Sequence, residues 1–157
     1  MKLRSQVEHG LLCCLLMTTL EENETLSTSA LAKICDLPKP YLSKTLQALA
    51  RAGVIIGSQG TYGGYRLVRK APSITLLEIV QAIEGEIKTF ANCGLAEKIV
   101  PAGSIASVAS IIERSFNAAD SLWQDVLAAN NLESLARELN VTPAGLPDFE
   151  STSRRPN

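Results

Sequence analysis

Residues 28–70 read TSALAKICDLPKPYLSKTLQALARAGVIIGSQGTYGGYRLVRK, and their pattern decides the fold. The apolar segment Ser29–Ile34 predicts a short helix. The Cys35–Pro38 turn ends it, because Asp36 tolerates the left-handed backbone that such a turn requires. Tyr41–Arg51 predicts a second helix with one buried face, since leucines recur at helical spacing at Leu42, Leu46 and Leu49. These segments together form a helix-turn-helix.

Two short apolar strands follow the helices. They are predicted at Val54–Ile56 and Tyr65–Val68, and the glycine-rich segment 57–64 joins them as a hairpin loop. Helix, turn, helix and hairpin in this order indicate a winged helix-turn-helix, a mainly α-helical fold with a small β-wing. The usual partner of this fold is double-stranded DNA.

Charge is distributed unevenly along the chain. Residues 28–70 contain seven Lys or Arg residues and a single acid, Asp36. Residues 1–70 carry a net charge of +4 from nine bases and five acids, whereas residues 71–157 carry −5 from six bases and eleven acids. Phosphate binding requires a locally basic face rather than a basic protein. This distribution, together with the order of helices and wing, favours DNA over a merely solvated surface.

The whole sequence divides into four parts. A winged-helix domain is expected at 1–85, where the capping box Thr75–Glu78 opens the last helix. An irregular loop follows at 86–103, and a long helix with a short terminal helix at 104–140. The segment 141–157, rich in proline and polar residues, is expected to be a flexible tail.

Composition excludes several classes of protein. No apolar run approaches the ~20 residues that a membrane-spanning helix needs. Four cysteines without regular spacing indicate a reducing, cytoplasmic setting rather than a disulfide framework. An enzyme is not expected, because the chain has one histidine, His9, and lacks both a phosphate-binding glycine loop before a helix and a convincing nucleophile–base pair.

The long predicted helix carries two apolar stripes. One is a heptad seam formed by Ile105, Ala109, Ile112, Phe116, Ala119, Trp123 and Val126. The second runs beside it through Val108, Ile111 and Leu122. One stripe can pack on its own domain and leave the other for a partner. We therefore predict a homodimer, with interface residues Ile105, Ile112, Phe116 and Trp123. The alternative is a helix that lies on its own core.

A two-fold dimer has a consequence for the DNA site. It would place two recognition helices ~34 Å apart, which is one turn of B-DNA. The symmetry of the protein is then mirrored in the DNA, so the operator is expected to be palindromic.

Several motifs resemble those of a known family. They are the start Met1–Leu3, LPKPYLSK at 37–44, LQAL at 46–49, AGV at 52–54, GGYRL at 63–67 and ITLLEIVQAIEG at 74–85. Together they resemble the Rrf-type winged-helix regulators, the group that contains IscR, NsrR and CymR. The resemblance covers residues 1–95, and the long helix matches by pattern only. It implies a winged helix with a dimerisation helix and a function in transcriptional regulation, usually repression.

The recognition helix supplies the first DNA-binding candidates. Lys39, just before the predicted helix, is placed for a phosphate. Ser43 and Lys44 can reach phosphates or base edges, and Gln47 can read an adenine. Tyr41 either contacts DNA or only packs the turn.

The wing and the N-terminus supply the other candidates. The wing tip carries Gln59 and Tyr62, which in such proteins lie along the minor groove, and Arg66 is assigned to a phosphate. Lys2 and Arg4 are expected to hold the DNA backbone. Each phosphate contact that is lost should lower the salt dependence of binding by roughly one unit of slope.

The sensor region departs from the family pattern. Many relatives resemble iron–sulfur proteins with three cysteines in the loop before the long helix, whereas here the loop contains Cys93 alone. A cluster normally takes four ligands, mostly thiolates, so neither a cluster nor another metal is expected. The alternative that keeps a cluster uses Glu8 and His9 as ligands beside Cys93.

Two other sensors remain open. In one, Cys93 pairs with Cys13 or Cys14 as a thiol redox switch. The competing role for Cys13 and Cys14 is core packing, and Cys35 is expected to be structural. In the other, a small-molecule or protein effector binds near the first helix, the loop and the long helix.

A protein-interaction module is the alternative to a DNA-binding regulator. Winged helices also dock proteins without binding DNA, and this would suit the acidic second half of the chain. Loss of DNA retention on Lys44→Ala with Arg66→Ala supports the regulator, and unchanged retention favours the interaction module.

Overall fold

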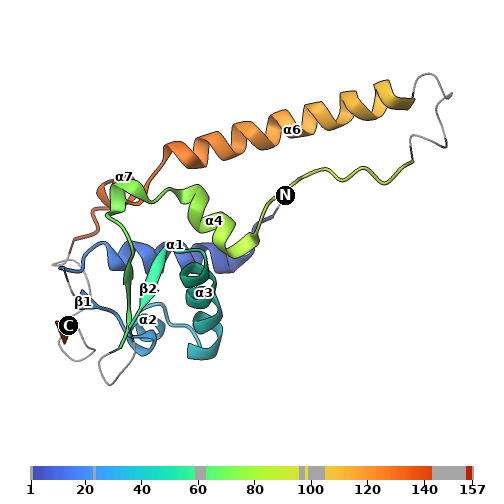
Figure 1. The fold of residues 1–157 in the computed structure, drawn as a ribbon. Coiled ribbons are helices and arrows are strands. Elements are labelled where there is room, and N and C mark those ends of the chain that lie inside the picture. Colours follow the sequence, from blue (N-terminus) through green and yellow to red (C-terminus); the bar gives the residue numbers. More distant parts are fainter. Residues whose placement is uncertain are drawn as a thin grey trace.

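The computed structural model describes residues 2–22, 24–58, 63–95, 98, 105–142 and 155–156, and the side chains of all of these except 105–110 and 155–156. In chain order the elements are α1 (Ser5–Met17), β1 (Glu24–Thr25), α2 (Thr28–Ile34), α3 (Lys39–Arg51), β2 (Ile55–Gly57), β3 (Tyr65–Leu67), the 3-10 helix η1 (Ala71–Ser73), α4 (Leu76–Glu84), α6 (Ile105–Ala129), α7 (Leu132–Glu138) and β4 (Arg155–Pro156). Helices α1 to α4 and the strands form a winged body, beside which α6 extends (Figure 1).

Local hydrogen bonds set the bounds of α2. The Ser27 hydroxyl accepts a hydrogen bond of 3.1 Å from the Ala30 amide and so caps the first turn. Asp36, with φ of 49°, ends the helix in the left-handed conformation. The Leu37 amide then donates to the Ala32 carbonyl (2.9 Å), as in a Schellman motif. The predicted turn is confirmed.

The ends of α3 and α4 follow the same rules. Gly53 (φ 71°) terminates α3 in the left-handed region, which glycine adopts without strain. The predicted capping box opens α4, with the Thr75 hydroxyl accepting from the Glu78 amide (3.2 Å) and the Glu78 carboxylate accepting from the Thr75 amide (2.8 Å). The end of α3 and the start of α4 are therefore set by residues next to them in the sequence.

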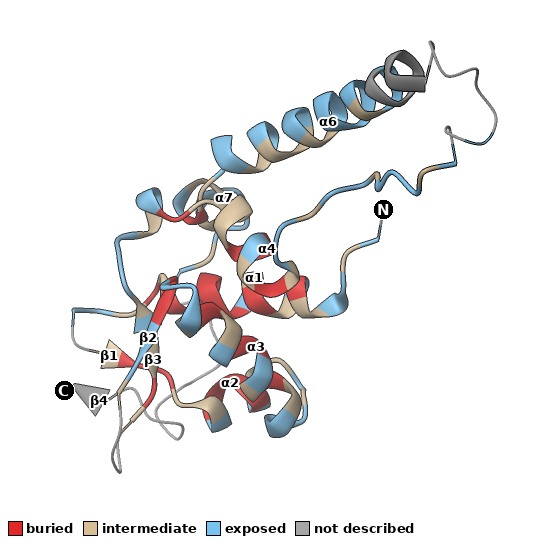
Figure 2. Cartoon of the chain, turned by 45° about the vertical axis from the view of Figure 1, so that its right-hand side comes forward, coloured by how far each residue is buried: buried red, intermediate tan, exposed pale blue. Residues whose placement is uncertain are grey.

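The core surrounds α1, which packs against α3, α4 and β3 (Figure 2). The predicted apolar face of α3 is confirmed, because Leu42, Leu46 and Leu49 are fully buried. A Cβ at Gly10 would lie 2.5 Å from the Ile83 Cδ1 atom, so α1 and α4 approach closely at this glycine. This packing fixes α3 on a rigid support.

The wing is an antiparallel hairpin of β2 and β3, in which Ile56 lies opposite Arg66. Leu26 and Tyr65 exchange two backbone hydrogen bonds of 2.8 and 3.0 Å, which attach the end of β1 to β3. Near the C-terminus, β4 pairs antiparallel with β1, so residues Arg155 and Pro156 of the tail form a strand. The rest of the predicted flexible tail beyond residue 142 lies outside the described residues.

Helix α6 begins at Ile105 and returns to the winged body at its C-terminal end (Figure 1). The Leu76 amide donates to the Asn130 carbonyl (2.9 Å), and the Leu132 amide donates to the Ile74 carbonyl (3.0 Å). The chain thus re-enters the body beside the start of α4. Neither α6 nor any other helix within the described ranges is long and apolar enough to cross a membrane.

The segment that leaves α4 is fastened to α6. The Thr89 amide and hydroxyl donate to the two carboxylate oxygens of Asp120, at 3.0 and 2.7 Å. These bonds, the amide bond first, hold the pKa of Asp120 below its usual range. One turn away, the rings of Phe90 and Phe116 stack with centroids 4.9 Å apart.

Candidate nucleic-acid interface

The exposed face of α3 carries basic side chains and the side-chain amide of Gln47. Lys44, Gln47 and Arg51 are exposed on the side opposite the buried leucines, and Lys39 is exposed at the first residue of the helix. None of the three cations forms an ion pair within the described part of the chain. Their charges are therefore free for an external partner, and a helix face of this kind fits the major groove.

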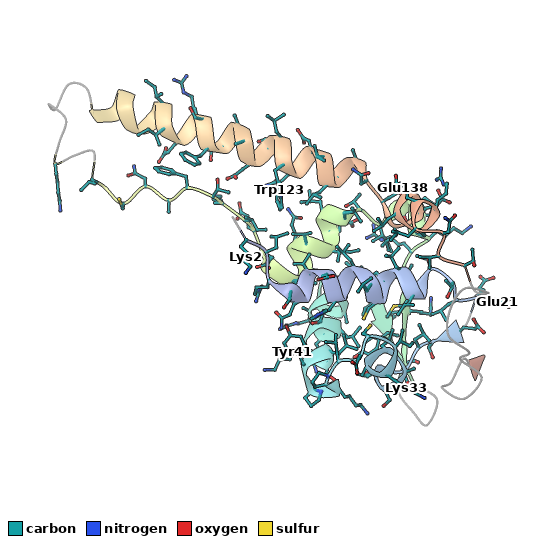
Figure 3. All side chains as sticks on the ribbon, turned by 180° about the vertical axis from the view of Figure 1, so that it is seen from behind. Lys2, Glu21, Lys33, Tyr41, Trp123 and Glu138 are labelled. Carbon is teal, nitrogen blue, oxygen red and sulfur yellow. The ribbon has the colours of Figure 1, made fainter. Side chains whose placement is uncertain are left out.

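Two of the predicted α3 contacts have partners inside the protein. The Ser43 hydroxyl donates to the Lys39 carbonyl one turn earlier (2.8 Å). The Tyr41 hydroxyl lies 3.3 Å from the Ser5 hydroxyl, and its ring packs edge-on against His9 with centroids 5.5 Å apart. Figure 3 shows Tyr41 on α3 below α1. Tyr41 therefore joins α3 to α1.

The wing presents Arg66 on its exposed side. The residue lies in β3, and no ion pair holds its guanidinium among the residues described. Gly64 positions the strand, because a Cβ there would lie 2.7 Å from the Leu26 carbonyl carbon and oxygen. The predicted wing-tip contacts, Gln59 and Tyr62, lie outside the described residues.

The two N-terminal candidates differ. Lys2 is exposed (Figure 3), as a phosphate contact requires. Arg4 instead forms an ion pair with Glu84, with 2.9 Å between Nε and Oε2, and its guanidinium also donates to the Ile83 carbonyl. Its amide donates to the same Glu84 carboxylate (2.7 Å). In this structure Arg4 fastens the N-terminus to α4, a role that the sequence did not indicate.

Arg69 is likewise occupied inside the protein. Its guanidinium lies 2.6 Å from a Glu78 carboxylate oxygen and donates to the Ser73 carbonyl. Burial alone would raise the pKa of Glu78, but hydrogen bonds from Arg69 and Thr75 outweigh it and lower the pKa. The basic residues thus divide into internal ties and cations without an ion pair among the described residues, and four of the latter, Lys39, Lys44, Arg51 and Arg66, lie on α3 and β3.

The four cysteines lie in different surroundings. Cys13 and Cys14 are buried in the core, whereas Cys93 is exposed on the segment after α4. The Cys13 thiol is hydrogen-bonded to Cys35, the residue that caps the C-terminus of α2. This bond raises the pKa of Cys13 and lowers that of Cys35, and burial raises the pKa of Cys14 to about 12. Cys35 therefore forms a hydrogen-bonded thiol pair with Cys13, in addition to ending α2.

The donors for an iron–sulfur cluster, which the family resemblance implies, do not come together. No three His, Cys, Asp or Glu side chains of the described residues are grouped as metal ligands. The Nδ1 atom of His9 is buried without a hydrogen-bond partner, at the ring that packs on Tyr41. Cys93 is the single cysteine after α4, so even the whole sequence lacks the thiolates a cluster needs. The residues present do not fit the group.

The two stripes of α6 lie differently relative to the winged body. Trp123 packs against the protein's own core, and Figure 3 shows it on the side of α6 that faces the winged body. Phe116 stacks on Phe90, Ile112 is 38% exposed, and the Ile105 side chain lies outside the described residues. The face left open carries Ile111, Leu122 and Val126, which are 50%, 68% and 62% exposed.

Comparisons with known proteins agree with this architecture. The Rrf2 family model, described as "Iron-dependent Transcriptional regulator", matches residues 3–138. The putative HTH-type transcriptional regulator YwgB of Bacillus subtilis is 25% identical over 133 residues, which cover 85% of this chain and 83% of that protein. The HTH-type transcriptional regulator IscR of Cereibacter sphaeroides is 40% identical over 62 residues, 40% of each chain.

Solved structures share the fold. The structure of CymR (YrzC), the global cysteine regulator of B. subtilis, matches with a TM-score of 0.64 at 24% identity, covering 88% of this chain and 98% of that one. IscR of T. potens matches with a TM-score of 0.59 at 20% identity, covering 94% and 93%.

The family match spans most of the chain and includes the winged helix and the helices that follow it. The family consists of transcriptional regulators and not of enzymes, in agreement with the sequence analysis. A winged helix with free cations on its recognition helix is the part that binds DNA in such proteins. The chain belongs to the Rrf2 family of DNA-binding transcriptional regulators.

Proposed function

We propose that this regulator binds a palindromic operator as a homodimer and represses transcription, with α3 in the major groove and the wing in the minor groove. The observation that carries the proposal is the division of the basic residues. Arg4 and Arg69 are tied to carboxylates, whereas Lys39, Lys44 and Arg66 have no ion-pair partner in the described part of the chain. Cations on a helix and on a neighbouring strand can contact the phosphates of both DNA strands that border a groove.

Each contact has its own role in this proposal. Lys39, Lys44 and Arg66 neutralise phosphates, and Lys2 extends this contact along the backbone. Gln47 reads an adenine edge, because its exposed amide offers both a donor and an acceptor. Tyr41 orients α3 through α1. Ser43 donates within α3, so its oxygen remains as an acceptor for the DNA edge.

The open stripe of α6 supports the homodimer. Ile111, Leu122 and Val126 project from a helix whose other face is already used by its own chain. A second copy of the same stripe is a self-complementary partner in a two-fold interface. This interface replaces the seam around Trp123 that the heptad pattern suggested.

The DNA test requires an operator, which selection from random duplexes supplies. We expect Lys44→Ala with Arg66→Ala to weaken binding to the selected duplex and to lower the salt slope by about two units per protomer. The matched control, Lys88→Ala with Lys98→Ala, removes two cations after α4 and should leave both quantities unchanged. Unchanged binding in the first double variant would instead support the protein-interaction module. Placing the selected operator over a reporter promoter tests repression.

We further propose that the response is thiol-based and that the protein holds no iron–sulfur cluster. Hydrogen peroxide oxidises the Cys35 thiolate to a sulfenic acid with release of hydroxide, and the Cys13 thiol then attacks this sulfur, giving a disulfide and water. Cys35 is the cysteine that peroxide oxidises first, because the hydrogen bond from Cys13 lowers the pKa of Cys35. Anaerobically purified protein should be colourless and iron-free. Peroxide should produce a Cys13–Cys35 cross-link by peptide mapping, absent in Cys35→Ser and present in Cys93→Ser.

A further inference from the structure

A groove separates the end of α1 from the strand that carries Arg66. Its cavity measures about 590 Å³, which lies in the size range of small-molecule sites. One wall is the turn after α1, from Met17 to Glu22, and the other runs from Arg66 in β3 to Ala71 in η1. Figure 1 shows that α1 ends beside these strands. The groove thus adjoins the wing but lies at the far end of α1 from Tyr41.

Opposite charges line the two walls. Glu21 and Glu22 lie on the α1 side, and Arg66 and Lys70 lie on the β3 side. None of these four groups forms an ion pair with another described residue. Arg69 also lines the groove, but its charge is used by Glu78. The groove therefore holds two unpaired carboxylates facing two unpaired cations.

Between the charged walls the surface is apolar. Met17 is 3% exposed, and Leu20 and Leu67 are partly buried against the core. An apolar floor with a few polar groups at fixed positions is typical of a small-molecule site.

We propose that this groove binds a free α-amino acid as a second effector of the regulator, in addition to the thiol response. The ammonium group of the ligand pairs with Glu21 and Glu22, its carboxylate pairs with Arg66 and Lys70, and its side chain covers the apolar floor. A polyanion is repelled by the carboxylate wall and a polycation by the basic wall, so the arrangement selects a zwitterion. A guanidinium and a carboxylate are matched for a bidentate contact.

The site connects ligand and DNA through a shared residue. Under the proposed function, on which this step rests, the Arg66 guanidinium neutralises a phosphate. The same guanidinium cannot hold the ligand carboxylate and the phosphate in full, so the two compete. Bound amino acid should therefore lower DNA affinity and reduce the salt slope by about one unit per protomer.

Titration calorimetry of the full-length protein with each of the twenty standard amino acids tests the site without DNA. We expect at least one to bind saturably, and Glu21→Gln with Glu22→Gln to weaken that binding at least tenfold. These residues lie in an exposed turn, so the variant should fold as the wild type does. Lys70→Met, on the opposite wall, should weaken binding as well. The control Glu86→Gln with Glu113→Gln removes two carboxylates elsewhere and should leave binding unchanged.

Each failure has its own signature. Absence of saturable binding by all twenty amino acids overturns the site, as does equal binding by the Glu21→Gln, Glu22→Gln variant. That variant should keep its affinity for the selected duplex but lose the effect of the amino acid on it. If the wild type binds the amino acid but no duplex, the proposed DNA function fails while the site stands.

Discussion

The winged body and α6 use apolar surface in opposite ways. Leu46 on α3 and Leu122 on α6 both belong to leucine-bearing stripes at helical spacing, yet the first is fully buried and the second is 68% exposed. In the winged body each stripe finds its partner within the same chain, whereas α6 uses one face internally and leaves the other open (Figure 2). Periodicity therefore identifies an apolar face but does not identify what covers it.

The largest effect is expected at the core of the winged body. Leu46→Ala leaves a cavity in the core, so we expect it to lower the free energy of unfolding by about 2–5 kcal/mol. Leu122→Ala is its matched control and should change the unfolding of the dilute protomer little. Urea denaturation at low protein concentration measures both, and equal losses would show that α6 is part of the same core.

Added charge on the exposed apolar stripe of α6 tests the proposed dimer interface. Leu122→Glu with Val126→Glu places four carboxylates across the proposed two-fold interface, so the dimer dissociation constant should rise at least tenfold, or about 1.4 kcal/mol. Asn117→Glu with Ser121→Glu adds the same charge on another exposed face and serves as the control. Sedimentation equilibrium gives the constants. Dimers that persist in the first variant would place the interface elsewhere.

A smaller effect is expected at the attachment of the wing. Gly64→Ala forces a methyl group against the Leu26 backbone, which cannot rotate away as a side chain can, so the pairing of Leu26 with Tyr65 should loosen. The cost should be about 1–3 kcal/mol. Hydrogen exchange should rise at the Leu26 and Tyr65 amides and remain unchanged on α6. Ser58→Ala, in the same hairpin, controls for a change of side chain without a backbone clash.

The smallest effect compares one carboxylate in each region. The pKa of Glu78 is lowered in the folded state, so its contribution is present above its unfolded pKa of about 4.3 and is lost as pH falls through the folded value. Because the pair is partly exposed, Glu78→Gln should cost about 0.5 kcal/mol at pH 7 and nothing at pH 2. Thermal unfolding across pH gives this difference, and a constant difference would contradict the assignment.

Asp120→Asn is the counterpart on α6. It should speed hydrogen exchange at the Thr89 amide at neutral pH, because the amide loses a charged acceptor. The unfolding of the winged body should not change, since this tie lies outside it. A parallel loss of stability would show that the segment after α4 supports the winged body.

Local signals predicted most of the winged body. Asp36 and the Thr75–Glu78 capping box act within a few residues of themselves, so the sequence alone was sufficient to place them. The Arg4–Glu84 ion pair could not be predicted, because its partners are 80 residues apart and many other pairings of opposite charge were available.

The candidate site was predicted less completely. The pattern showed which α3 side chains are exposed, but not that Tyr41 contacts His9 or that Cys13 faces Cys35. These contacts depend on how α1 crosses the helix-turn-helix. The pattern also did not show which stripe of α6 packs on its own core, since both stripes are apolar and only tertiary packing distinguishes Trp123 from Leu122.

The hydrogen bonds that join Leu76 to Asn130 and Leu132 to Ile74 make the α6 arm a detachable insertion. The chain leaves the winged body at the end of α4 and returns beside its start, a span of about 14 Å for a nine-residue helix. A linker of about five residues can bridge that distance. The arm can therefore change its length while the helix-turn-helix and wing stay in place, and replacing residues 86–129 with such a linker should leave α1 to α4 folded at the cost of the contacts that Trp123 and Leu127 make with the core.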